Sequence, residues 1–236
     1  MEEILFYVLV AVSVVMSAVF IYFSNGQTNL RSIVLKAISS FLFTAVAIYA
    51  CFLNLFTLGT MLFVLGFVLS CFGDVILGLP DFPELKEKKN KAIVSGGMFF
   101  AAAHVAYYIA MIILFGWAWW PLLIAVLLAA FFFLFTKLAL KIDFGKMSGG
   151  IAFYSLFVSI VTSQGIYALF ALNFSLYSIL IAIGFLLFYV SDIVLMKIYF
   201  NNNERQNNRV LYYYNLGLYY AAQILIATSL ILVHAI

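Results

Sequence analysis

Eight stretches of about 20 mainly apolar residues follow one another along this chain of 236 residues. At a rise of about 1.5 Å per residue, a helix of that length crosses the hydrocarbon core of a bilayer. In lipid the backbone must satisfy its own hydrogen bonds, and a helix does so within one segment. The sequence therefore predicts an all-α, polytopic membrane protein with eight transmembrane helices in a single domain, residues 1–236. We expect these helices at residues 4–24, 32–53, 57–79, 92–115, 119–136, 148–171, 174–198 and 211–234.

The composition agrees with a membrane protein and excludes several other classes. Hydrophobic residues make up 67% of the chain and charged residues only 9%, too few to cover the surface of a soluble domain. The net charge is +3, and its basic residues lie in short connections rather than on one face, so no nucleic-acid partner is expected. Cys51 and Cys71 lie in separate apolar stretches, which favours buried thiols over a disulfide.

The basic residues are distributed on one side only. All 12 Lys and Arg residues lie in or beside four polar connections, at 24–31, 80–91, 137–146 and 201–209. The other three connections, near Asn54, Gly116 and Asn173, contain no Lys or Arg. The positive-inside rule then places the four polar connections in the cytoplasm and both termini outside. We expect a multi-pass protein of a bacterial inner membrane, with its site toward the cytoplasmic leaflet.

The two halves of the chain resemble each other. Residues 66–77 (GFVLSCFGDVIL) align with residues 184–195 (GFLLFYVSDIVL), and 99–104 (FFAAAH) align with 218–223 (LYYAAQ) at nearly the same offset. This pattern predicts two parallel four-helix repeats, about 1–116 and 117–236. Such repeats commonly form their site at the interface between the copies.

Three charged residues lie well inside the predicted helices: Lys36, Asp74 and Asp192. Each costs about 2.5–3.5 kcal/mol at the centre of a lipid-facing helix, so we expect them to face one another inside the bundle. His104 and Gln223 lie deeper, near the middle of the membrane.

Several neighbouring residues complete this polar set. By helical spacing, Tyr107 shares a face with His104, and Tyr219 shares one with Gln223. Tyr154 aligns with Lys36 in the second half of the chain. Tyr212–Tyr214 are expected as anchors at the membrane boundary.

Each of these residues also has a structural interpretation. Lys36 and Asp74 could form an ion pair that only holds two helices together, and His104 and Gln223 could hydrogen-bond between helices. Ser191 fits helix packing as well as a site. A metal site at Asp74, Asp192 and His104 stays open as an alternative, although zinc hydrolases usually use more histidines.

The motifs resemble those of the YhhN family, the membrane lysoplasmalogenases, over essentially the whole chain. One departure is Met196-Lys197, where the family more often continues with small or apolar residues. The residues that carry the resemblance are Lys36; Ser70, Gly73, Asp74 and Leu77; Gly96, Phe100, His104 and Tyr107; Gly184, Phe188, Ser191, Asp192 and Leu195; and Tyr219, Ala222, Gln223, Leu225 and Ile226.

The resemblance implies hydrolysis of the vinyl-ether bond of a lysophospholipid to a fatty aldehyde and a glycerophospho-base. We expect neither a cofactor nor a metal. Such a bond is cleaved by acid, so the site needs one protonated carboxylic acid and one ionised carboxylate. We assign Asp192 as the acid, and Asp74, held ionised by Lys36, as the group that activates water.

The remaining residues of the site have supporting roles in this hypothesis. His104, Tyr154 and Gln223 would hydrogen-bond the ether oxygen or the water, and Tyr107, Ser191 and Tyr219 complete the site. The sequence does not indicate an oligomeric state.

A second interpretation belongs to another functional class. Parallel repeats with a Lys–Asp pair and a second aspartate also fit a proton-coupled transporter of a small molecule or lipid. Carriers tend to break their helices at the site, and the three prolines here lie at loops or helix ends. Four lysines of the connection before the fourth helix could attract a lipid phosphate or belong to a solvated loop; they are Lys86, Lys88, Lys89 and Lys91.

Overall fold

The computed structural model describes residues 2–24, 30–54, 56–79, 89–200 and 209–235. In this part of the chain all regular structure is helical, and eight helices are long and apolar enough to cross a membrane. This confirms the predicted all-α, multi-pass architecture. The helices are α1 (Glu2–Ser24), α2 (Leu30–Leu53), α3 (Leu58–Gly78), α4 (Lys89–Phe115), α5 (Trp120–Leu134), α6 (Ser148–Ala171), α7 (Leu176–Phe200) and α9 (Arg209–Ser229).

The helix bounds agree with the expected ranges to within a few residues, except at two ends. The α-helical part of α5 stops at Leu134 and continues as a π-helical turn, Phe135–Ala139, in which the Thr136 hydroxyl donates to the Phe132 carbonyl oxygen at 2.8 Å. The last helix tightens into a 3-10 turn, Leu230–Ala235. The side-chain amide of Asn54 donates to the carbonyl oxygens of Leu230 and Ile231, so this turn is fixed to the end of α2.

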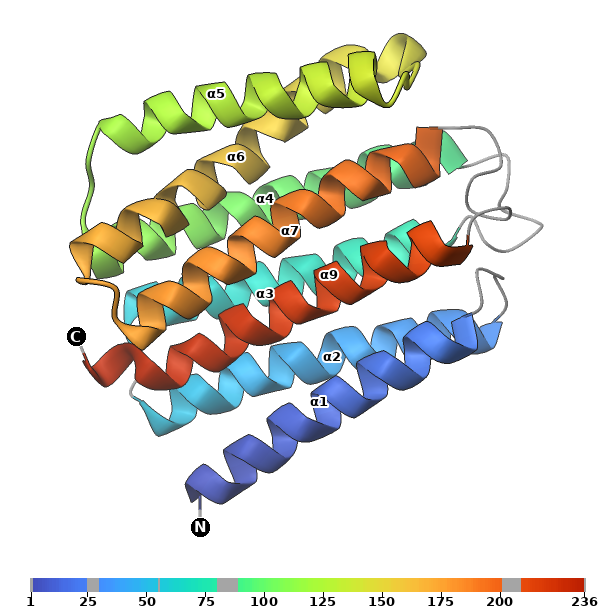
Figure 1. Cartoon of the computed structure of the whole chain (residues 1–236). Helices are drawn as coiled ribbons and strands as arrows, with labels where there is room; N and C mark the ends of the chain where they lie inside the picture. Colours follow the sequence, from blue (N-terminus) through green and yellow to red (C-terminus); the bar gives the residue numbers. More distant parts are fainter. Residues whose placement is uncertain (1, 25–29, 55, 80–88, 201–208, 236) are drawn as a thin grey trace.

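The helices lie side by side with their axes roughly aligned (Figure 1). The N- and C-termini lie at one end of the bundle, and the helix ends that carry the basic residues lie at the other (Figure 1). We call the latter the basic end; it includes Arg31, Lys89, Lys146 and Arg209. Lys86 and Lys88 lie outside the described residues.

Glycines allow the closest helix contacts. A Cβ atom built on Gly66 of α3 would lie 2.3 Å from the ring of Tyr107 on α4, and one on Gly184 of α7 would lie 2.5 Å from the side chain of Ile226 on α9. The two pairs of helices therefore pack through the same device, a glycine on one helix facing a large side chain on the next.

Other contacts also recur at matching positions of the two halves. The Thr44 hydroxyl of α2 lies 3.5 Å from the carbonyl oxygen of Phe67 on α3, and the Thr162 hydroxyl of α6 lies 3.3 Å from that of Phe185 on α7. In both cases the hydroxyl makes a shorter bond to the carbonyl oxygen four residues earlier in its own helix, at 2.9 Å for Thr44 and 2.8 Å for Thr162. The hydroxyl oxygen also lies close to a carbonyl oxygen of the next helix, so the same packing contact occurs twice.

Replacing Gly66 by alanine tests the tight contact between α3 and α4. Tyr107 is fully buried and cannot move aside, so we expect Gly66→Ala to lower the free energy of unfolding by about 1–3 kcal/mol. Gly217→Ala is the matched control, because a Cβ there meets no atom within 4 Å. Unfolding of the purified protein in detergent measures both, and equal stability of the two variants would contradict the packing argument.

Candidate active site

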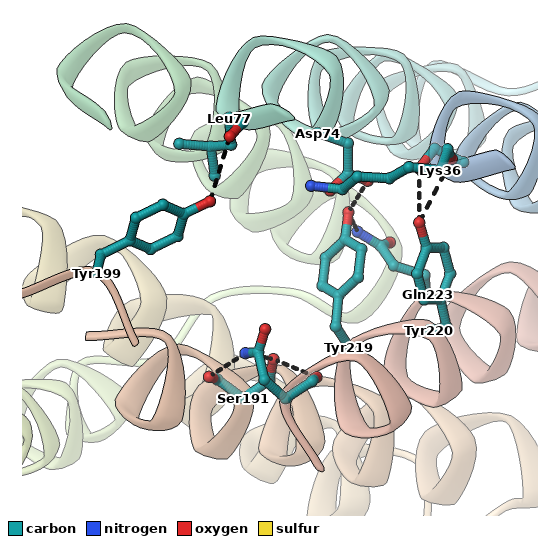
Figure 2. A network of polar contacts seen from close by, with 10 residues as sticks. Lys36, Asp74, Leu77, Ser191, Tyr199, Tyr219, Tyr220 and Gln223 are labelled. Carbon is teal, nitrogen blue, oxygen red and sulfur yellow. Dashed lines mark hydrogen bonds and ion pairs between the residues drawn. The ribbon is translucent and has the colours of Figure 1, made fainter. Parts of the chain in front are cut away.

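Asp74 lies at the centre of a buried polar cluster. Its Oδ1 atom is 3.1 Å from the Lys36 ammonium nitrogen, and its Oδ2 atom accepts hydrogen bonds from the hydroxyls of Ser40 and Tyr219, both at 2.6 Å. In Figure 2 Asp74 and Tyr219 point toward each other from above and below, and the Lys36 side chain reaches the carboxylate from the right. The carboxylate is 2% exposed, so its charge is compensated by these side chains rather than by bulk water.

A second row of polar groups supports this cluster. The Tyr220 hydroxyl lies 3.3 Å from the Ser40 hydroxyl and donates to the backbone carbonyl of Lys36 at 3.4 Å (Figure 2). The Gln223 amide donates to the Tyr219 hydroxyl at 3.2 Å, and Tyr107 approaches the Gln223 carbonyl oxygen at 3.5 Å. Gln223 therefore leaves the Tyr219 proton directed at Asp74.

Asp192 has a different environment, although it is equally buried. The Tyr154 hydroxyl of α6 donates to its Oδ2 atom at 2.6 Å. Asp192 has no ion-pair partner among the residues that the structure describes. The two aspartates thus differ in one decisive respect: a cation neutralises Asp74, and a neutral phenol faces Asp192.

Both aspartates line one small cavity of about 40 Å³ between α2, α3, α7 and α9. A single water needs only about 10–15 Å³ by this measure, and the carboxylates and hydroxyls provide the polar partners that a buried water requires. This polar cavity has room for a few waters and not for a lipid. The structure brings to it five of the predicted site residues: Lys36, Asp74, Ser191, Asp192 and Tyr219.

A larger apolar groove of about 370 Å³ lies beside the polar cavity, between α3, α4, α6 and α7. Tyr154 lines this groove, while the carboxylate to which it donates lines the polar cavity. The two spaces share a wall of four residues: Leu77, Phe100, Leu195 and Tyr199. The Tyr154–Asp192 hydrogen bond therefore connects an apolar space to a polar one.

The remaining predicted residues, His104, Tyr107 and Gln223, line neither space and contact residues of the site from outside it. His104 is buried and lines neither space; its Nδ1 atom lies 2.6 Å from the Phe100 carbonyl oxygen, and its ring packs on Phe188 and Tyr154. Tyr107 and Gln223 lie behind Tyr219. Within the described residues, no three His, Cys, Asp or Glu side chains come together as a group that could hold a metal ion, and this includes Asp74, Asp192 and His104.

Four residues at the site were not singled out as site residues from the sequence. Ser40 and Tyr220 belong to the Asp74 cluster, and Asn215 holds Ser191 by donating to its carbonyl oxygen at 2.8 Å. Tyr212, expected as a boundary anchor, is instead buried and lines the polar cavity. The one available signal was for Ser40, which follows Lys36 by one helical turn and so shares its face.

Comparison with known proteins places the chain in a family. The model of the YhhN family matches residues 31–230, which is most of the chain and includes every residue of the two spaces except Phe20. No curated protein and no solved structure matches the chain.

The Lys36–Asp74 ion pair leads to a stability prediction. Lys36→Met leaves a buried carboxylate without its cation, so we expect the free energy of unfolding to fall by about 3–5 kcal/mol. The double variant Lys36→Met/Asp74→Asn removes both charges and should regain most of this loss. Unfolding in detergent measures both variants; a single variant as stable as the double would show that the pair is not buried as described.

Proposed function

The chain belongs to the YhhN family, and we propose that it is a lysoplasmalogenase-like hydrolase. Its reaction would be cleavage of the vinyl-ether bond of an alkenyl lysophospholipid to a fatty aldehyde and a glycerophospho-base. The observation that carries this proposal is the pair of buried aspartates on one polar cavity, one neutralised by Lys36 and the other hydrogen-bonded only by a phenol among its described side-chain partners.

This difference suits the acid and base steps of the reaction. Asp192, with no cation beside it, carries the proton and gives it to the alkenyl carbon, which leaves an oxocarbenium ion. Asp74, held ionised by Lys36, Ser40 and Tyr219, takes a proton from a cavity water as that water attacks the cation. The resulting hemiacetal collapses to the aldehyde and a free glycerol hydroxyl, and the proton from the water restores Asp192.

The supporting residues hold these two groups in position. Tyr154 lies between Asp192 and the apolar groove. When Asp192 is protonated, its O–H can donate to the Tyr154 oxygen, which frees the Tyr154 proton for the ether oxygen. Gln223 and Tyr107 fix the Tyr219 hydroxyl toward Asp74. His104 lines neither space and packs on Tyr154, so its proposed role is to position that ring rather than to contact the lipid.

We also propose that the bundle consists of two parallel four-helix repeats, residues 1–116 and 117–236. The recurring glycine and threonine contacts support this arrangement. At equivalent positions, Lys36 and Asp74 in the first half correspond to Tyr154 and Asp192 in the second. The concentration of basic residues at one end supports a cytoplasmic location for that end, with both termini outside.

The helices that carry the site favour a hydrolase over a transporter. Carriers commonly unwind helices where they bind their cargo. Here α2, α3, α7 and α9 each continue without interruption through Lys36, Asp74, Asp192 and Tyr219. The π-helical turn after α5 lies outside both spaces.

The first test measures aldehyde released by purified protein from an alkenyl lysophospholipid, with the saturated alkyl-ether analogue as a substrate control. We expect aldehyde from the alkenyl lipid alone. Asp74→Asn and Asp192→Asn should each lower turnover by at least about 100-fold, the lower end of what general acid–base groups contribute. Asp143→Asn, in the exposed connection after α5, should retain wild-type turnover. Wild-type turnover in either site variant would rule out the aspartate mechanism.

The role of Tyr154 has its own test. Tyr154→Phe removes a hydrogen bond to a carboxyl group and a hydroxyl of a residue that lines the groove, so we expect turnover to fall about 10- to 100-fold. Tyr189→Phe is the matched control, because the Tyr189 hydroxyl donates to the Leu128 carbonyl and lines neither space. Equal rates in the two variants would exclude Tyr154 from the reaction.

A further inference from the structure

The apolar groove lies in the part of the bundle nearest the basic end. Its lining residues on α4 are confined to positions 93–101, and those before and on α6 to positions 146–154. Both segments begin next to the basic connections and end at the depth of Tyr154. The groove therefore occupies one leaflet of the membrane and stops where the Tyr154–Asp192 hydrogen bond begins.

The chemistry of the lining fits a hydrocarbon chain with an anionic group at one end. Most lining side chains are aliphatic, thioether or aromatic, among them Val94, Met98, Ile151 and Met196. Lys146 is the one cation among the lining residues, and it lies at the rim nearest the basic end. At about 1.5 Å per residue, Lys146 and Tyr154 are separated by roughly 12 Å along the helix axis.

Two glycines keep the groove open. A Cβ atom built on Gly97 or on Gly150 meets no atom within 4 Å, so neither glycine serves helix packing. The neighbouring Gly96 is different, since a Cβ there would lie 2.6 Å from the Leu77 side chain. Glycine inside a helix costs about 1 kcal/mol relative to alanine. Gly97 and Gly150 carry this cost without allowing a close helix contact. Their effect is to leave open space in the groove.

We propose that this groove is the binding site for a single-chain phospholipid, which enters sideways from the leaflet at the basic end, between α4 and α6. The inference rests on the proposed function and adds the route and position of the substrate. The vinyl-ether bond, which joins the hydrocarbon chain to the glycerol, lies at Tyr154, opposite the water in the polar cavity. From there the glycerophosphate extends along the groove toward Lys146, and the hydrocarbon chain runs along the apolar walls and out between α4 and α6. A volume of about 370 Å³ is near the lower end of ligand pockets, which suits one chain rather than two.

Filling the groove tests this assignment. Gly97→Leu and Gly150→Leu put a side chain into the space. A Cβ atom at either position meets no atom within 4 Å, and leucine raises helix propensity, so we expect both variants to fold. Gly149→Leu is the matched control, because Gly149 also has open space around it but does not line the groove. Binding is measured with a radiolabelled saturated alkyl-ether lysophosphatidylethanolamine, which cannot be hydrolysed, and the rate with the alkenyl lipid.

We expect the two groove variants to bind the alkyl-ether lipid at least about tenfold more weakly, a change of about 1.4 kcal/mol, with a matching rise in KM. Gly149→Leu should bind within about twofold of wild type. If the groove variants bind and turn over the lipid like Gly149→Leu, the assignment is wrong. If wild type releases no aldehyde but the groove variants still lose binding, the groove assignment holds and the proposed hydrolase function fails.

Lys146→Gln tests the position of the phosphate. The variant should weaken binding of the alkyl-ether lysophospholipid severalfold and leave binding of a phosphate-free alkylglycerol unchanged. Equal loss for both ligands would overturn the assignment of the phosphate to Lys146. A two-chain alkyl-ether phospholipid that competes as well as the single-chain lipid would show that the groove holds bilayer lipid instead.

Discussion

The ion pair between Lys36 and Asp74 is the contact on which the polar interior depends. A carboxylate in the hydrocarbon region is tolerated only when its charge is compensated, and Lys36, Ser40 and Tyr219 do this from two other helices. Satisfying one carboxylate thus fixes the rotation of α2 and α9 against α3. Tyr219 in turn needs Gln223, and Ser40 lies against Tyr220, so much of the polar order around the cavity follows from this one charge.

Hydrolysis inside a membrane requires water and lipid to meet at one place only. The polar cavity and the apolar groove share Leu77, Phe100, Leu195 and Tyr199, so these four side chains form the wall between the two spaces. The Tyr154–Asp192 hydrogen bond is a polar connection that joins the two spaces. For the proposed reaction, such a separation limits contact between the two reactants to the group that transfers the proton.

The features that could be predicted from the sequence were those that change the free energy of a helix in lipid by a large amount. Long apolar stretches predicted all eight helices, and the cost of charge in lipid directed attention to Lys36, Asp74 and Asp192. Ser40, Asn215 and Tyr220 carried no comparable signal, because serine and tyrosine are common in such helices for reasons of packing. His104 shares a helix face with Phe100, yet only Phe100 reaches the two spaces, since that depends on how α4 is rotated by its packing on Gly66 and Gly73. The groove depends on a gap between two helices, which no single segment encodes.

The contrast between Lys36 and Tyr154 has a consequence for how such a site can arise. A symmetric dimer of identical four-helix chains would present the same side chain to both of its carboxylates. Both carboxylates would then be neutralised by a cation, or neither would. One could not serve as the acid while the other serves as the base. Joining both sets of helices in one chain removes this restriction, because each half can be mutated separately. In the proposed two-repeat arrangement, the covalent connection between α4 and α5 is thus what permits each half to give its carboxylate a different partner.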